Sequence, residues 1–243
     1  MDRTSRAYLR QLPWFVAAVL VILLLAAILV RVIYVRQEQR AAMLLNAVLF
    51  LRPGESSATD IEGIVANYKG GPADISGLAC DPHGPSYIVH IANDALNSMG
   101  RSAALAVLRP RTVNAIFILK NGTLCYVQYS VEIVPGRRLR PVRTNASVTL
   151  ASETELLPFD VEYLGGNIRF FQVALTSEAT PDQHRRAFDF DLSCLARFSG
   201  CRVACELMPS AWLDYQKKAR AEGRALRPEE LGDPHCKKLT ASP

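Results

Sequence analysis

The chain has 243 residues, of which 49% are hydrophobic and 21% charged, with 14 glycines and 14 prolines. This composition excludes a disordered, collagen-like or low-complexity protein. The net charge of +5 is concentrated near the N-terminus, because residues 1–40 carry six arginines against Asp2 and Glu38, a balance of +4. The rest of the chain is left with only +1. We therefore expect no nucleic-acid partner, since no basic domain remains.

A run of 18 residues without a charge, from Pro13 to Val30, predicts a transmembrane helix. At 1.5 Å per residue it covers ~27 Å, close to the ~30 Å hydrocarbon layer. Trp14 and Tyr34 mark its two ends, where aromatic rings favour the headgroup region. The alternative is a cleaved signal peptide, whose apolar core is about 7–15 residues and is followed by a small-residue cleavage site. The longer, arginine-flanked run favours an uncleaved single-pass anchor in the lipid bilayer over residues 13–35.

The flanking charges barely define the orientation of this anchor, because three arginines lie on each side of it. The preceding tail, residues 1–12, is short. The rest of the chain contains six cysteines, an even number that suits an oxidising compartment. We therefore expect a signal-anchor in the cell membrane, with a cytoplasmic N-terminus and an extracytoplasmic C-terminal domain.

Helical segments follow the anchor. Residues 36–52 contain no helix breaker before Pro53-Gly54 and are predicted to form a helical stalk. Ser57 and Asp60 have the spacing of a capping box and predict a helix that ends at Gly70-Gly71. Its apolar face is Ile61, Ile64, Val65 and Tyr68. Pro209 fits the start of a C-terminal helix that carries Trp212.

The middle of the chain is rich in β-branched and aromatic residues. Asn121-Gly122 suits a type I′ turn between two strands, and the alternation over Phe188–Leu192 predicts a half-buried strand. The hairpins and helices together predict an α+β fold, with one mainly antiparallel domain over residues 53–236 and a frayed tail over 237–243. The further expected elements are strands at 86–92, 113–119, 124–134, 147–150, 159–164 and 168–176, and a helix at 94–107.

The six cysteines allow 15 pairings, so the connectivity does not follow from the sequence alone. Cys194 and Cys201 bracket a short turn and are the first choice for a disulfide. Cys80 with Cys125, and Cys205 with Cys236, would then complete a structural framework. Free thiols, a metal site and a redox pair are the alternatives, but no zinc-finger or Cys-x-x-Cys spacing occurs.

No motif for a nucleophile, a metal or a nucleotide occurs in the chain. His90 on a strand favours a structural role over a general base, and His83 lies in a turn. Asp189 and Asp191 have the Asp-x-Asp form of some metal–nucleotide sites, although strand alternation explains them equally well. We therefore assign no catalytic, cofactor-binding or metal-ligating residue.

Basic and acidic residues alternate by segment. Residues 101–143 are mainly basic and residues 151–191 mainly acidic. Cross-strand ion pairs are one explanation. The other is a basic surface for an anionic envelope component, lipid or polysaccharide, at Arg137, Arg138, Arg140 and Arg143.

Two stretches resemble known bacterial envelope proteins. Leu44-Leu45 with Leu51–Ile64 (LRPGESSATDIEGI) resembles the helix start of the small BamE/SmpA-like lipoproteins of the outer-membrane assembly machinery, although a lipobox cysteine is absent. Phe188–Leu195, Gly200-Cys201 and Leu207–Trp212 are similar to uncharacterised anchored or secreted bacterial proteins. The resemblance implies an envelope location and an α+β domain, and carries over no site.

Three functions fit these features. The first is a membrane-tethered, non-catalytic binding or scaffolding module of the cell envelope. The second is an envelope hydrolase or transferase whose site is assembled on the sheet. The third is a type II secretory-pathway glycoprotein, with acceptor sequences at Asn121 and Asn145.

Overall fold

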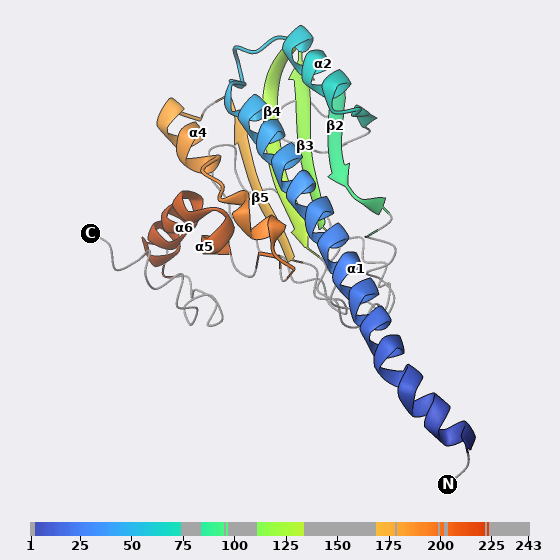
Figure 1. The fold of residues 1–243 in the computed structure, drawn as a ribbon. Coiled ribbons are helices and arrows are strands. Elements are labelled where there is room, and N and C mark those ends of the chain that lie inside the picture. Colours follow the sequence, from blue (N-terminus) through green and yellow to red (C-terminus); the bar gives the residue numbers. More distant parts are fainter. Residues whose placement is uncertain are drawn as a thin grey trace, which may run out of the picture.

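A long N-terminal helix crosses one face of an antiparallel sheet, and short helices flank it on the same side (Figure 1). The predicted α+β class is therefore confirmed. The computed structural model describes residues 3–73, 84–94, 96, 111–133, 169–177, 179–198, 200–201, 204–221 and 223. Predictions at 97–107, 147–150 and 159–164 lie outside these residues.

Helix α1 (Arg3–Leu49) has two halves with different surroundings. The first half projects away from the domain (Figure 1), and its most apolar 18-residue window has a mean hydropathy of 3.1. By length and composition, α1 can span a membrane. The second half, which includes most of the predicted stalk, packs on the sheet through one face. That face consists of Tyr34, Gln37, Ala41, Leu44, Leu45 and Val48.

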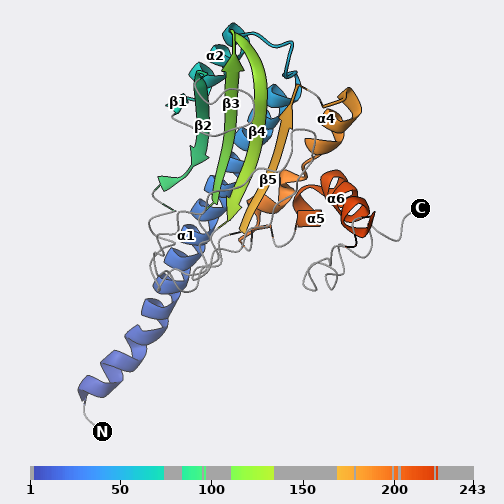
Figure 2. The same cartoon turned by 180° about the vertical axis from the view of Figure 1, so that it is seen from behind.

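The sheet has five strands in sequential order, each antiparallel to the next. Viewed from behind, it lies in front of α1 (Figure 2). The strands predicted from residue 86, 113, 124 and 168 are confirmed to within two residues, and β1 is an addition. The strands are β1 (Gly71–Ala73), β2 (Ser86–Ala92), β3 (Arg111–Lys120), β4 (Thr123–Ile133) and β5 (Arg169–Thr176).

The β3–β4 turn has the predicted type I′ character. Asn121 and Gly122 have φ of 54° and 80°, and Lys120 pairs with Thr123. The tip of this hairpin is held by the start of the next helix, because the Ala58 amide donates to the Gly122 carbonyl at 2.9 Å. The hairpin and the helix therefore fix each other.

Helix α2 (Ala58–Asn67) begins with the predicted capping box. The Asp60 amide donates to Ser57 Oγ at 3.4 Å, and the Ser57 amide donates to Asp60 Oδ2 at 2.9 Å. These hydrogen bonds lower the pKa of the Asp60 carboxyl. The end of the helix differs from the prediction: the left-handed residue is Lys69 (φ 55°), not a glycine.

The prediction of a strand at Phe188–Leu192 is wrong. Phe188 and Phe190 pack on the core, but Asp191 caps a 3₁₀ helix by accepting from the Ser193 amide at 3.0 Å. The alternating apolar and acidic residues therefore lie between the end of one helix, at Phe188, and the start of the 3₁₀ helix, at Asp191. The C-terminal helices are α4 (Pro181–Ala187), η2 (Leu192–Ala196), α5 (Ala204–Leu207) and α6 (Pro209–Ala221), and α6 starts at Pro209 as predicted.

The core lies between α1 and the sheet. Phe117 and Val127 are fully buried there with Leu44 of α1. The Tyr129 hydroxyl donates to the Ala41 carbonyl at 3.0 Å, and burial raises the pKa of this phenol. Because one sheet residue hydrogen-bonds the backbone of α1, the helix is a structural part of the domain.

The disulfide between Cys194 and Cys201 is confirmed, with a Cα–Cα distance of 4.9 Å that suits the bond. Cys125 and Cys205 are also disulfide-bonded. Cys80 and Cys236 lie outside the described residues, so the pairings Cys80–Cys125 and Cys205–Cys236 stay predictions.

Candidate functional site

The domain meets α1 at the end of the apolar run. Tyr34 is only 2% exposed and packs with Leu96, Val30 and Ile33. Of the aromatic residues expected at the two ends of the anchor, Trp14 is 78% exposed, whereas Tyr34 faces the domain. The contact between the domain and α1 therefore begins at Val30, at the end of the apolar run, with no linker between the run and the domain.

Arg111, at the start of β3, joins three parts of this junction. Its guanidinium lies over the Tyr34 ring, and its Nη2 donates to the carbonyls of Arg197 and Phe198, the latter at 3.1 Å. Its own carbonyl accepts from Gln37 Nε2 at 2.9 Å. The residue is 1% exposed. Nothing in the sequence signals that this arginine is buried, because an exposed arginine can equally begin a strand.

A groove lies between the second half of α1 and helix α4. Its first part is a hollow of about 320 Å³ with Arg52, Glu55 and His184 among its lining residues. Its second part, of about 540 Å³, shares Leu49 and Arg185 with the first and extends toward α6. We call both parts together the α1–α4 groove.

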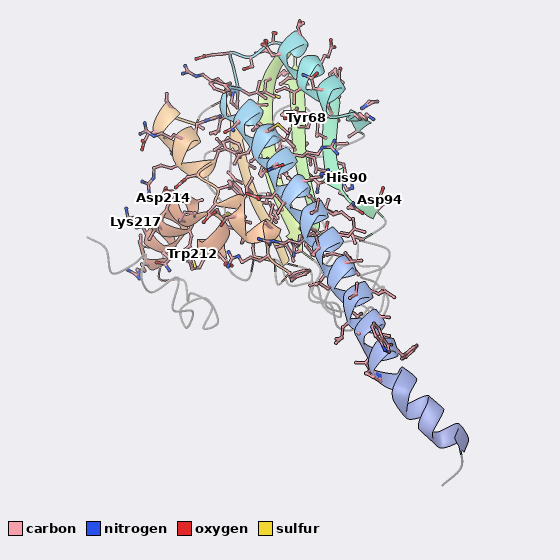
Figure 3. All side chains as sticks on the ribbon, in the orientation of Figure 1. Tyr68, His90, Asp94, Trp212, Asp214 and Lys217 are labelled. Atoms are coloured by element: carbon pink, nitrogen blue, oxygen red, sulfur yellow. A yellow bond between two sulfur atoms is a disulfide. The ribbon has the colours of Figure 1, made fainter. Side chains whose placement is uncertain are left out.

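The charges of the α1–α4 groove are balanced. Each arginine has an acidic partner, so the lining does not form a purely basic surface, and Asp189 accepts from Ser210 Oγ at 2.5 Å. Figure 3 shows Asp214 on α6, beside α4. The ion pairs are Arg52–Glu55 at 3.6 Å, Arg185–Asp182, and Arg186–Asp214 at 2.6 Å.

His184 is the titratable residue of the groove that sequence reasoning missed. Its Nε2 is buried and has no hydrogen-bond partner among the described residues. Desolvation lowers its pKa, against the opposing effect of a hydrogen bond to the Leu51 backbone. The stretch Thr180–Gln183 (TPDQ) could have predicted helix α4, which carries His184. Thr180 and Gln183 form a capping box, and proline favours the first helical turn.

Phe50 adjoins the lining of the α1–α4 groove in the sequence, although its own side chain does not line either hollow. It follows Leu49, which lines both hollows, and its side chain is 86% exposed. An aromatic side chain this exposed gains buried area when a partner covers it, and such residues are typical anchors of protein interfaces.

The opposite face of the sheet carries a row of polar residues. His90, Asn114, Ser130 and Gln172 are successive partners across β2–β5. His90 Nδ1 lies 2.7 Å from Asn114 Oδ1, and Figure 3 shows His90 on β2. Since Ser130 is two strands away, ~10 Å from His90, the two residues are outside hydrogen-bond reach. Ser130 and His90 therefore do not form a nucleophile–base pair.

The remaining predicted residues fall into two groups. Asp189 and Asp191 have the helix-related partners described above, and no cluster of metal-ligand type occurs in the part of the chain that the structure describes. Asn121 is exposed at its turn. Outside the described residues lie His83, Asn145, Arg137, Arg138, Arg140 and Arg143.

Comparison with known proteins returns no match among protein-family models, curated proteins or solved structures. The BamE/SmpA-like resemblance therefore stays a prediction.

Proposed function

We propose that this chain is a single-pass membrane protein whose C-terminal domain, outside the cytoplasm, binds or scaffolds another component of the cell envelope. One observation carries the proposal: the apolar helix α1 continues without a break into the core of the domain. A helix of this kind holds a binding surface at a fixed height above the bilayer.

The disulfides support the location. Cys194–Cys201 is bonded, and such bonds persist in oxidising compartments rather than in the cytoplasm. Because the flanking arginines are equally divided, this bond is the best support for placing the domain outside.

The α1–α4 groove supports binding of a polypeptide. Its arginines are matched by acids, which suits a partner of mixed charge better than a polyanion. Exposed Phe50 supplies an apolar anchor beside the polar lining. We therefore place the binding surface at Phe50 and the groove.

The membrane anchor is tested by replacing Leu23 and Leu24 with arginine, with alanine replacements as the control. Each arginine should cost about 2.5–3.5 kcal/mol of insertion free energy, so the arginine variant should leave the membrane pellet after alkaline carbonate extraction. The parent and the alanine variant should stay in the pellet. A C-terminal alkaline phosphatase fusion should be active; an inactive fusion would place the domain in the cytoplasm.

The binding surface is tested with a photoreactive phenylalanine at position 50 and, as the control, at position 90. Both positions are exposed, but His90 lies on the strand face away from the groove. Illumination of intact cells should give a discrete protein adduct from position 50 and none from position 90. Equal labelling from both positions would contradict a binding role for the groove.

A further inference from the structure

We propose that the loop carrying Phe198 is a second membrane contact, which inserts its aromatic ring into the headgroup region of the bilayer beside α1. This inference rests on the proposed membrane span. It assigns to the domain a surface that touches the lipid directly, in addition to the helix that anchors it.

The exposure of Phe198 is the first observation. Among the large hydrophobic side chains that the structure describes, those with high exposure belong to α1, to Phe50 just after it, and to Phe198, which is 38% exposed. Phe198 is thus the exception in the rest of the described domain. A single exposed ring is by itself ordinary on a protein surface, so the position of Phe198 relative to α1 decides its role.

The height of Phe198 above the bilayer core follows from its contact with α1. Its ring packs edge-on against Tyr34, with the ring centroids 6.1 Å apart. Tyr34 is four residues beyond Val30, which corresponds to ~6 Å along the helix. The headgroup region extends ~5–7 Å beyond the hydrocarbon layer. Phe198 therefore lies at the depth where aromatic side chains favour the membrane interface.

The loop is also conformationally constrained. The Cys194–Cys201 disulfide closes it, and the Gly200 amide donates to the Arg197 carbonyl at 3.0 Å. Arg111, which stacks on Tyr34, donates to the Phe198 carbonyl. A ring presented by such a constrained loop loses little conformational entropy when it inserts.

The neighbouring charges suit this placement. Arg31 and Arg36 are exposed on α1 on either side of Tyr34. Arginine side chains at this height can reach lipid phosphates, and long basic side chains extend toward the headgroups. A lipid surface is therefore favoured as the occupant over a second protein, which would have to enter the headgroup layer.

Tryptophan fluorescence in the full-length chain tests the inference. The background is Trp14→Phe, which retains the buried Trp212 and whose emission is subtracted from that of each variant. Phe198→Trp is then compared with the matched control Phe50→Trp. Position 50 is ~24 Å farther along α1 than Tyr34. In nanodiscs that hold one copy, brominated phosphatidylcholine should reduce the emission of the tryptophan added at position 198 about twofold and leave that of the tryptophan added at position 50 unchanged. Equal quenching at both positions, or none at position 198, would overturn the inference.

Comparison with the parent protein distinguishes failure of the Phe198 contact from failure of the proposed membrane span. The emission lost on Trp14→Phe reports Trp14 alone, so quenching of Trp14 without quenching at position 198 rejects only the Phe198 contact. An unquenched Trp14 rejects the span itself. If Phe198→Trp does not fold, a photoreactive phenylalanine at position 198 replaces it: a lipid adduct supports the inference, and a chain-to-chain adduct without lipid overturns it.

Discussion

The guanidinium of Arg111 stacks on the ring of Tyr34, with Cζ 3.8 Å from the ring centroid. The first residue of β3 is thereby fixed to the helix that carries the proposed span. Both side chains are almost completely buried, at 1% and 2% exposure. A cation–π contact removed from water is worth about 2 kcal/mol, considerably more than the same contact on a surface.

Removing the ring should therefore destabilise the domain. We expect Tyr34→Leu to lower the free energy of unfolding by about 2 kcal/mol, whereas Tyr34→Phe, which keeps the ring, loses less. Denaturation in detergent micelles, followed by near-ultraviolet circular dichroism, measures both. Equal losses in the two variants would show that stacking on the ring contributes nothing.

Replacing Gly70 or Gly63 by alanine should change the stability of the protein in opposite directions. A Cβ at Gly70 would lie 2.5 Å from the Ile88 carbonyl oxygen, and that backbone has no room to move within the sheet. Gly70→Ala should therefore cost about 1–3 kcal/mol of stability. Gly63, inside α2, has open space around its Cβ position. Gly63→Ala should stabilise the protein by about 0.5–1 kcal/mol, because glycine is a poor helix former.

The pair provides its own control, since both changes add one methyl group. Thermal melting of the two variants beside the parent checks the signs. A Gly70→Ala protein as stable as the parent would mean that the turn between α2 and β1 relaxes freely.

Protonation of His184 should weaken the fold in mild acid. Desolvation lowers its pKa in the folded state, whereas the unfolded residue titrates near about 6.5. The unfolded chain therefore binds more protons below that pH, so stability falls as the pH drops through about 6.5 and levels off below the folded-state pKa. His184→Phe should flatten this dependence between pH 7 and pH 5.

Melting temperatures across this range measure the effect. Between pH 7.5 and 8.5 the histidine is neutral in both states, so the difference between variant and parent should be constant there. A variant with the same acid slope as the parent would assign the pH dependence to other groups.

The Cys194–Cys201 disulfide should contribute about 2.5 kcal/mol, because it closes a loop of about eight residues in the unfolded chain. The double serine variant should lose about that amount. The single variant Cys194→Ser should in addition leave a thiol that forms intermolecular bridges. Non-reducing peptide mapping of the parent should yield a peptide linking the two cysteines. A link from either one to Cys80 would contradict this structure.

Local signals explain the parts of the fold that the sequence predicts well. The Asn121-Gly122 turn and the Ser57–Asp60 capping box depend on residues a few positions apart, so they can be recognised without the tertiary structure. Strand β2 has the predicted bounds because its apolar run is clearly delimited. The prediction of an α+β fold rested on these elements.

The parts that were missed depend on contacts distant in the sequence. Asp189 binds Ser210 and Asp191 caps η2, so the alternation around Phe188 cannot be distinguished from a strand without those partners. Buried Arg111 depends on Tyr34, 77 positions earlier in the printed sequence. The α1–α4 groove could not be predicted because α4 was not, although the Thr180–Gln183 capping pattern was available.

Because α1 runs unbroken from Arg3 to Leu49, rotating the proposed membrane-spanning segment about the helix axis rotates the domain by the same angle. At 3.6 residues per turn, one residue inserted after Val30 would turn the domain by about 100° about the helix axis and raise it by about 1.5 Å. Any neighbour that packs against one side of the helix within the bilayer therefore faces one defined side of the domain. The direction in which the α1–α4 groove opens is accordingly set by the angular position of this helix among its neighbours.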